Sequence, residues 1–215
     1  MTVGLVTIGL LIVVPLLVLP SLLGATPASA SDLKGPGIRP PLDGSSCGIT
    51  SIACSVDIAA LPQIGDMWCV PAAASAIIGG VADQSYLAWI MGTSDRGTPF
   101  RRVPRALNPF SDHAFTFSHG RASYRDADGL LATVRYQVGV LRRALILGVE
   151  GDLLPYWPSG VWGLHAVVVS GWRGAYLLVW DPLHETWNLR TGGFHLVLPV
   201  DLARAGAANS RAMIR

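Results

Sequence analysis

The sequence has few charged residues and no tract of a single sign. Of its 215 residues, 14% are charged and the net charge is +2, with basic and acidic side chains scattered along the chain. Nucleic-acid-binding domains carry clustered basic residues, so no nucleic-acid partner is expected. Hydrophobic residues make up 51%, which is enough to fill the core of one domain and too many for intrinsic disorder.

Several catalytic and metal-binding motifs are also missing. No glycine-rich phosphate loop is present. His113 and His119 lie close together in the chain, but no C-x-x-C or H-E-x-x-H frame accompanies them. No metal site is therefore expected, and the sequence implies no cofactor.

The N-terminus holds the one long apolar run. Residues 3–23 are almost wholly apolar, and the small residues Ala28-Ser29-Ala30 follow them. This is typical of a secretory signal peptide over residues 1–30, although the run is also long enough to be an uncleaved membrane anchor. In either case we expect a secreted or cell-surface domain that contacts the membrane only through this segment, if it is uncleaved.

Only three cysteines are present, and an extracytoplasmic location makes their pairing informative. Cys47 and Cys54 are seven residues apart in a loop-like stretch and can close a small disulfide. Cys69 would then be a free thiol. The alternative is three unpaired, buried cysteines.

The rest of the chain divides by composition. Residues 31–46 are rich in Pro, Gly and Ser and predict a linker, residues 47–202 a compact domain, and residues 203–215 a tail. Helices are expected over residues 69–78, 84–91, 99–107 and 126–137, and strands over residues 144–149, 166–170, 175–180 and 195–200. Helices first and strands later predict an α+β fold with two unlike halves and a site in the cleft between them.

The runs HAVVVSGW and AYLLVWD, joined through Trp-Arg-Gly, predict a β-hairpin. If Gly171 and Ala175 flank its turn, His165 lies directly across from Asp181, within reach of a side-chain hydrogen bond. A slip of one residue would place the two side chains on opposite faces of the sheet.

Cys69 stands where an alanine-rich helix is expected to begin. Unpaired N–H groups and the helix dipole favour a thiolate, the reactive form of a thiol, at such a position. An imidazole must accept the thiol proton and a third group must orient that imidazole, and His165 and Asp181 fit these roles. The backbone N–H of Cys69 and the side-chain amide of Gln63 are candidate oxyanion donors.

Residues 61–182 resemble the papain-like cysteine peptidases, and more narrowly the C39-like group of exported bacterial peptidases. The resemblance rests on Q-x5-C-x-P-A-A-A, DQSYLAWIMGTSDRGTPFRRVPRALN, LHAVVVSGW and VWDP. It implies a papain-like α+β fold, with a helical N-terminal half packed on an antiparallel C-terminal sheet. It also implies the following roles: Gln63 as oxyanion donor, Cys69 as nucleophile, His165 as general base and acid, and Asp181 as the orienting residue.

Two residues depart from the family pattern. Val70 stands where Gly commonly follows the nucleophile, and we expect it to crowd the cleft; Leu164 precedes the histidine where a small residue is frequent. His184 is a competing candidate for the base, and His195 is expected in a peripheral strand. The aromatic stretch 153–163 is expected either to form a wall of the cleft or to cap the core.

The expected function is that of a cysteine peptidase, which hydrolyses a peptide or protein substrate through a thioester on Cys69. Two alternatives stay open. A thiol acyl-transferase or amidase acting on cell-wall peptides would use the same four residues, and a catalytically silent binding module would keep only the fold.

Overall fold

An antiparallel sheet, with strands from both ends of the domain, forms the centre of the fold. The computed structural model describes residues 47–157, 163–183 and 193–215, so the predicted signal peptide, the linker and His184 lie outside the described residues. The strands are β1 (Ala53–Ser55), β2 (Phe117–Ser118), β3 (Leu145–Glu150), β4 (Leu164–Arg173), β5 (Tyr176–Asp181), β6 (Gly193–Val197) and β7 (Met213–Ile214). Their order is β2-β7-β3-β4-β5-β6, and β1 pairs with β4 outside this path.

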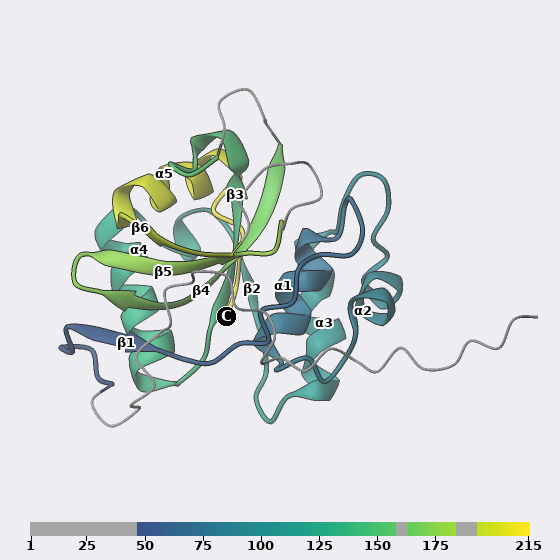
Figure 1. The fold of residues 1–215 in the computed structure, drawn as a ribbon, viewed down its shortest axis with the longest axis horizontal. Helices are drawn as coiled ribbons and strands as arrows, with labels where there is room; N and C mark the ends of the chain where they lie inside the picture. The colour runs from purple at the N-terminus through teal and green to yellow at the C-terminus, as the bar shows by residue number, and fades with distance from the viewer. Residues whose placement is uncertain (1–46, 158–162, 184–192) are drawn as a thin grey trace, which may run out of the picture. The chain divides into compact units, whose positions relative to one another are not determined.

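Helices cover both faces of this sheet. They are α1 (Cys69–Ile77), α2 (Gln84–Met91), α3 (Val103–Leu107), α4 (Ala127–Val134) and α5 (Pro199–Ala208). Helices α1, α2 and α3 lie on one side of the sheet and α4 and α5 on the other (Figure 1). Within the described parts of the chain, no helix has the length and apolar character needed to cross a membrane.

The core consists of two clusters, one on each face of the sheet. Val167 and Val169 of β4 belong to the cluster under α4 and α5, whereas Ala166 and Val168 belong to the cluster under α1, α2 and α3. Successive side chains of a strand point to opposite faces. Because both faces of β4 are covered, its central residues 166–169 are a continuous apolar run without polar alternation.

The predicted helices and strands are largely observed, with differences at their ends. The helix predicted at residues 99–107 is a 3-10 turn, Phe100–Arg102, followed by α3, and the helix predicted at 126–137 is α4 followed by a π-helical turn, Arg135–Val140. The strand predicted at 195–200 is wrong in its second half, since Pro199 opens α5. Proline suits the first turn of a helix because the N–H groups there have no intrahelical acceptor.

Residues 203–215 are an integral part of the fold and not the predicted tail. Helix α5 continues to Ala208, and β7 lies between β2 and β3 in the sheet. Met213 and Ile214 are fully buried. A two-residue strand is too short to show an alternating pattern, so the sequence does not reveal it.

The turn of the β4–β5 hairpin is tighter than predicted. Arg173 pairs with Tyr176, so the turn contains two residues, and Gly174 in it has a φ of 58°. Glycine adopts this left-handed conformation without steric cost. The prediction that Gly171 and Ala175 flank the turn is therefore wrong.

A β-bulge at Ser170 then shifts the register of β4 against β5 by one residue. Extending the pairing beyond the bulge brings Asp181 beside Val167, so His165 is a diagonal neighbour and not directly opposite as predicted. Diagonal neighbours share a face and are about 7–8 Å apart, within reach of long side chains. Without the bulge, Asp181 would pair with Val168, and His165 would point to the other face.

Cys47 and Cys54 are joined by a disulfide, and Cys69 is the free cysteine. Cys54 lies in β1 and is almost fully buried in the cluster beneath α4 and α5. The disulfide therefore fastens the start of the described chain to the sheet.

Candidate active site

Cys69 is the first residue of α1. The first hydrogen bond of this helix runs from the Ala72 N–H to the Trp68 carbonyl, over 2.8 Å. The N–H groups of Cys69 and Val70 therefore precede it and have no acceptor inside the helix, and Pro71 has no N–H to satisfy. The half-buried thiol thus lies beside backbone donors that are available to a ligand.

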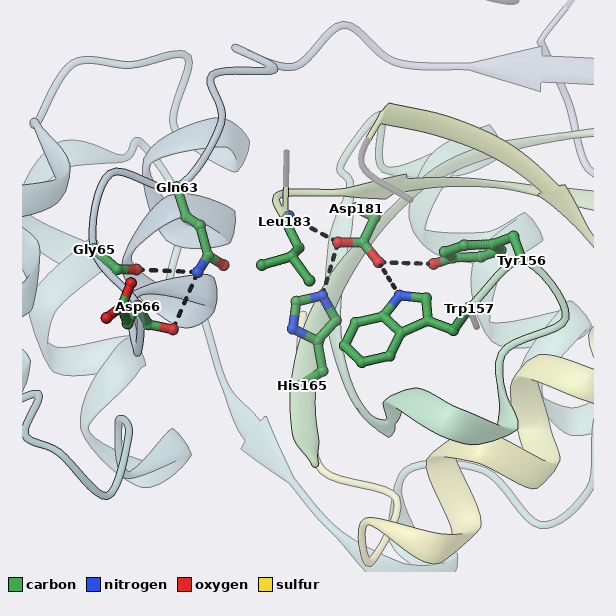
Figure 2. A network of polar contacts seen from close by, with 8 residues as sticks. All are labelled: Gln63, Gly65, Asp66, Tyr156, Trp157, His165, Asp181 and Leu183. Carbon is green, nitrogen blue, oxygen red and sulfur yellow. Dashed lines mark hydrogen bonds and ion pairs between the residues drawn. The ribbon is translucent and has the colours of Figure 1, made fainter. Parts of the chain in front are cut away.

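His165 and Asp181 form a buried hydrogen-bonded pair. The His165 Nε2 donates to Asp181 Oδ1 over 2.8 Å, and the two residues are 6% and 0% exposed. Nδ1 is the ring nitrogen left for another partner, and it points to the side on which Gln63 lies (Figure 2).

The Cys69 side chain acts on the same imidazole. Burial is the largest single influence on His165 and lowers its pKa, but the charge and hydrogen bond of Asp181, followed by the hydrogen bond and charge of Cys69, outweigh it. The pKa of His165 is therefore well above its usual value. Since Asp181 occupies Nε2, Nδ1 is the ring nitrogen available to Cys69. Asp181 thus holds one side of the His165 ring, and Cys69 lies near enough to raise the pKa of the same imidazole.

Asp181 accepts four hydrogen bonds although it is fully buried. Its Oδ1 accepts from His165 and from the Leu183 N–H (2.8 Å), and its Oδ2 accepts from the Tyr156 hydroxyl (3.1 Å) and the Trp157 Nε1 (3.0 Å). Burial raises the pKa of Asp181, but the charge of His165 and the hydrogen bonds from His165, Leu183 and Trp157 outweigh burial and lower it. The carboxylate stays ionised and can stabilise an imidazolium.

Gln63 lies on the side to which the Nδ1 of His165 points (Figure 2), but both hydrogens of its amide are already donated to backbone carbonyls. The Nε2 donates to the carbonyls of Gly65 (3.0 Å) and Asp66 (3.2 Å). The buried Oε1 has no hydrogen-bond partner among the described residues. To donate to an oxyanion, as the sequence predicts, Gln63 must share one of these hydrogens with the substrate or release a carbonyl.

One peptide unit connects Gln63 to Asp181. The Leu183 N–H donates to Asp181 Oδ1, and the carbonyl of the same peptide unit, which belongs to Pro182, accepts from the Gln63 backbone N–H over 2.8 Å. A peptide unit is planar and rigid. It therefore fixes the loop that precedes Cys69 relative to the end of β5.

Gln84, the first residue of α2, holds the Gln63 loop from another side. Its Oε1 accepts from the Ile64 N–H (3.1 Å), and its Nε2 donates to the Pro62 carbonyl (2.8 Å). Sequence reasoning missed this residue, because a glutamine at a helix start carries no distinctive pattern. Its burial is the feature that reveals its role.

Tyr156 and Trp157 were also missed as partners of Asp181. The sequence singles out the aromatic stretch 153–163 only as a wall of the cleft or a cap on the core. Residues 158–162 of this stretch lie outside the described residues. The two aromatic rings instead direct their polar atoms at the carboxylate that binds His165 (Figure 2).

Three further residues that the sequence singles out are Val70, Leu164 and His195. Val70 of α1 is 3% exposed and packs in the core cluster under α1, α2 and α3, so it does not crowd a cleft as predicted. Leu164, directly before His165, is 69% exposed. His195 lies in β6, at one end of the described strand order, and stacks on Tyr156.

The two histidines considered for a metal have partners of other kinds. His113 forms hydrogen bonds with Ser111 and Asp112, and His119 stacks on Phe117. Over residues 47–157, 163–183 and 193–215, no group of three or more potential metal ligands is found.

Solved structures with a similar fold are described as peptidases or proteases. A protein described as a C39-like peptidase from Bacillus anthracis superposes with a TM-score of 0.51 at 12% identity, covering 74% of this chain and 95% of its own. A double-glycine-motif protease of an AMS/PCAT transporter, solved with its leader peptide, gives a TM-score of 0.50 at 12% identity, covering 75% of this chain and 91% of its own.

No family model matches the sequence, and no curated relative matches it. The likeness therefore lies in the fold, with mixed helices and an antiparallel sheet in the arrangement that the sequence predicts. The fold of this chain is that of the C39-like, papain-like cysteine peptidases.

Proposed function

We propose that this protein is a cysteine peptidase that hydrolyses peptide bonds through a thioester on Cys69. The observation that carries the proposal is the buried His165–Asp181 hydrogen bond, together with a thiol at the start of α1 that raises the pKa of the same imidazole. The leader peptide bound by the similar transporter protease supports a peptide as substrate.

The reaction begins with transfer of the Cys69 proton to Nδ1 of His165. The thiolate attacks the peptide carbonyl carbon, and the oxyanion that forms is bound by the Cys69 N–H and the Gln63 amide. The imidazolium then protonates the departing amine, which leaves a thioester on Cys69. His165 next removes a proton from water, whose attack releases the carboxylic acid and restores the thiol.

Asp181 determines which nitrogen of His165 acts. Because its carboxylate accepts from Nε2–H, the neutral imidazole carries its proton there and keeps Nδ1 free as the base. The same carboxylate stabilises the imidazolium once Nδ1 is protonated.

We also propose that the domain works outside the cytoplasm, as its N-terminal residues suggest. A disulfide between Cys47 and Cys54 fits an oxidising compartment. Mass spectrometry of the protein from its native host tests this proposal through the position of the mature N-terminus, and recovery of the chain only in the cytoplasm with free thiols would contradict it.

The activity is tested with the purified protein and a library of peptides derived from a proteome, with products identified by mass spectrometry. We expect hydrolysed peptides with the wild type and none with Cys69→Ala, whose thermal stability should be nearly unchanged because one small half-buried group replaces another. Hydrolysis by Cys69→Ala would refute the proposal. New amide-bonded products in place of hydrolysed ones would identify an acyl-transferase instead.

A second experiment, chemical labelling of Cys69, does not depend on the choice of peptide. A thiol-directed reagent should label the wild type once, at Cys69, because the other two cysteines are bonded. If folded protein resists labelling, Cys69 is not an accessible nucleophile and the enzyme proposal fails.

A further inference from the structure

A carboxylate turns easily about its last side-chain bond unless both of its oxygens are held. In Asp181, Oδ1 binds His165, whereas Oδ2 accepts from the Tyr156 hydroxyl at 3.1 Å and the Trp157 Nε1 at 3.0 Å. Figure 2 shows both aromatic side chains reaching the oxygen that His165 does not contact.

We propose that Tyr156 and Trp157 are positioning residues that hold the Asp181 carboxylate in the orientation in which it binds His165. The inference rests on the proposed function, in which His165 is the base. It adds two residues, adjacent in the chain and ahead of β4, that act on the chemistry through Asp181.

The two aromatic rings are themselves fixed by packing. The ring of Tyr156 stacks on His195 with centroids 3.6 Å apart and an interplanar angle of 2°, and Trp157 packs beside the His165 ring with centroids 5.0 Å apart. A Cβ atom on Gly151 would lie 2.3 Å from the Trp157 ring, so only glycine leaves room for the indole there. Their donors are thus preorganised.

Both groups donate and neither takes a proton from Asp181. Burial, followed by the charge and hydrogen bond of Asp181, raises the pKa of Tyr156 well above its usual value, so its hydroxyl keeps its proton. The indole N–H of Trp157 can only donate. A proton on Oδ2 would face these hydrogens, which disfavours neutral Asp181 and extends the range of pH over which the carboxylate can stabilise imidazolium.

The test measures the rate at which iodoacetamide alkylates Cys69 in the full chain, from acidic to alkaline pH. Only the thiolate is alkylated, and an imidazolium stabilised by Asp181 favours the thiolate, so support from Asp181 lowers the pH at which alkylation falls off in acid (the acid edge). Tyr156→Phe and Trp157→Phe each remove one hydrogen bond to Asp181, which raises the pKa of its carboxyl. We expect the acid edge of alkylation to move up by about one pH unit, the loss of one charge-assisted hydrogen bond.

Two matched controls separate positioning from general damage. Trp172→Phe removes an indole hydrogen bond of similar length, from Trp172 Nε1 to the Ser51 carbonyl (2.9 Å), in the core and away from Asp181. Tyr136→Phe removes a hydroxyl from an exposed tyrosine. Trp172→Phe should lower the stability of the protein, and Tyr136→Phe should leave it nearly unchanged. Neither variant should move the acid edge of alkylation.

A double-mutant comparison tests whether the effect passes through Asp181. In an Asp181→Asn background, adding Tyr156→Phe should shift the profile no further, since the carboxylate that it positions is absent. With a cleaved peptide, Tyr156→Phe should lower kcat more than it raises KM, because Tyr156 acts on His165 through Asp181 and not on the bound substrate.

The outcomes distinguish this inference from the proposed function. A wild type whose Cys69 alkylates like an ordinary free thiol would refute the thiol–imidazole pair, and both proposals with it. A wild type with the extended acid range, but with the same edge in folded Tyr156→Phe and Trp157→Phe, would refute the positioning role alone. Tyr156→Phe removes a single oxygen, and near-UV circular dichroism will show that its packing is intact.

Discussion

At the residue scale, the hydrogen-bond partners of Gln63 give this residue two roles. Its two amide hydrogens bind the carbonyls of Gly65 and Asp66, and its backbone N–H binds Pro182. The same amide therefore shapes the loop before Cys69 and, in the proposed mechanism, binds the oxyanion. The two roles predict different kinetics when the side chain is removed.

Gln63→Ala should lower kcat by about 10²–10³-fold, the usual effect of losing one oxyanion donor, with a smaller change in KM. Gln84→Ala is the matched control, because Gln84 holds the same loop by its own hydrogen bonds. It should lower the stability of the protein and leave most of kcat. If steady-state kinetics give equal losses of kcat for both variants, Gln63 acts through the loop. Wild-type rates for Gln63→Ala would remove it from the site.

At the scale of elements, the bulge in β4 decides whether His165 and Asp181 can meet. It lies beside Gly171, which pairs with Ser55 of β1. A Cβ atom at Gly171 would lie 2.2 Å from the Cys54 carbonyl oxygen and 2.8 Å from Ser55 Cα. Only glycine therefore lets β1 pair closely with β4 next to the bulge.

Gly171→Ala should lower the free energy of unfolding by about 1–3 kcal/mol, because the added methyl group must push β1 aside. It should also reduce activity if the bulge moves. Gly174→Ala is the control in the same hairpin: nothing lies within 4 Å of its added Cβ, but its φ is positive, so it should cost about 1 kcal/mol. Urea unfolding measures both. A Gly171→Ala protein as stable as the wild type would show that β1 does not constrain the bulge.

At the scale of the whole domain, the sheet joins segments that are far apart in the chain. Strand β7 completes it between β2 and β3, and Ile214 pairs with both Phe117 and Ile146. The Pro182–Leu183 peptide connects the loop before α1 to the end of β5. The site therefore depends on the correct closure of the sheet as well as on its own residues.

Ile214→Ala should destabilise the protein by about 2–5 kcal/mol, because it leaves a cavity in a closely packed core. Val200→Ala is its control, since Val200 is exposed on α5 and a surface change of this kind usually costs less than about 0.5 kcal/mol. Chemical denaturation gives both values. A loss below about 1 kcal/mol for Ile214→Ala would mean that the last strand is dispensable.

The sequence by itself determined the local elements and their order, since helix starts, apolar periodicity and turn residues are encoded within a few positions. The α+β arrangement, the helix that begins at Cys69 and the strands that carry His165 and Asp181 were all predictable in this way. Tertiary structure alone decided the bulge that puts His165 and Asp181 on one face, the donors of Tyr156 and Trp157, the occupied amide of Gln63 and the last strand. Each of these depends on contacts between residues distant in the chain, and no local pattern records which atoms such contacts bring within hydrogen-bonding distance.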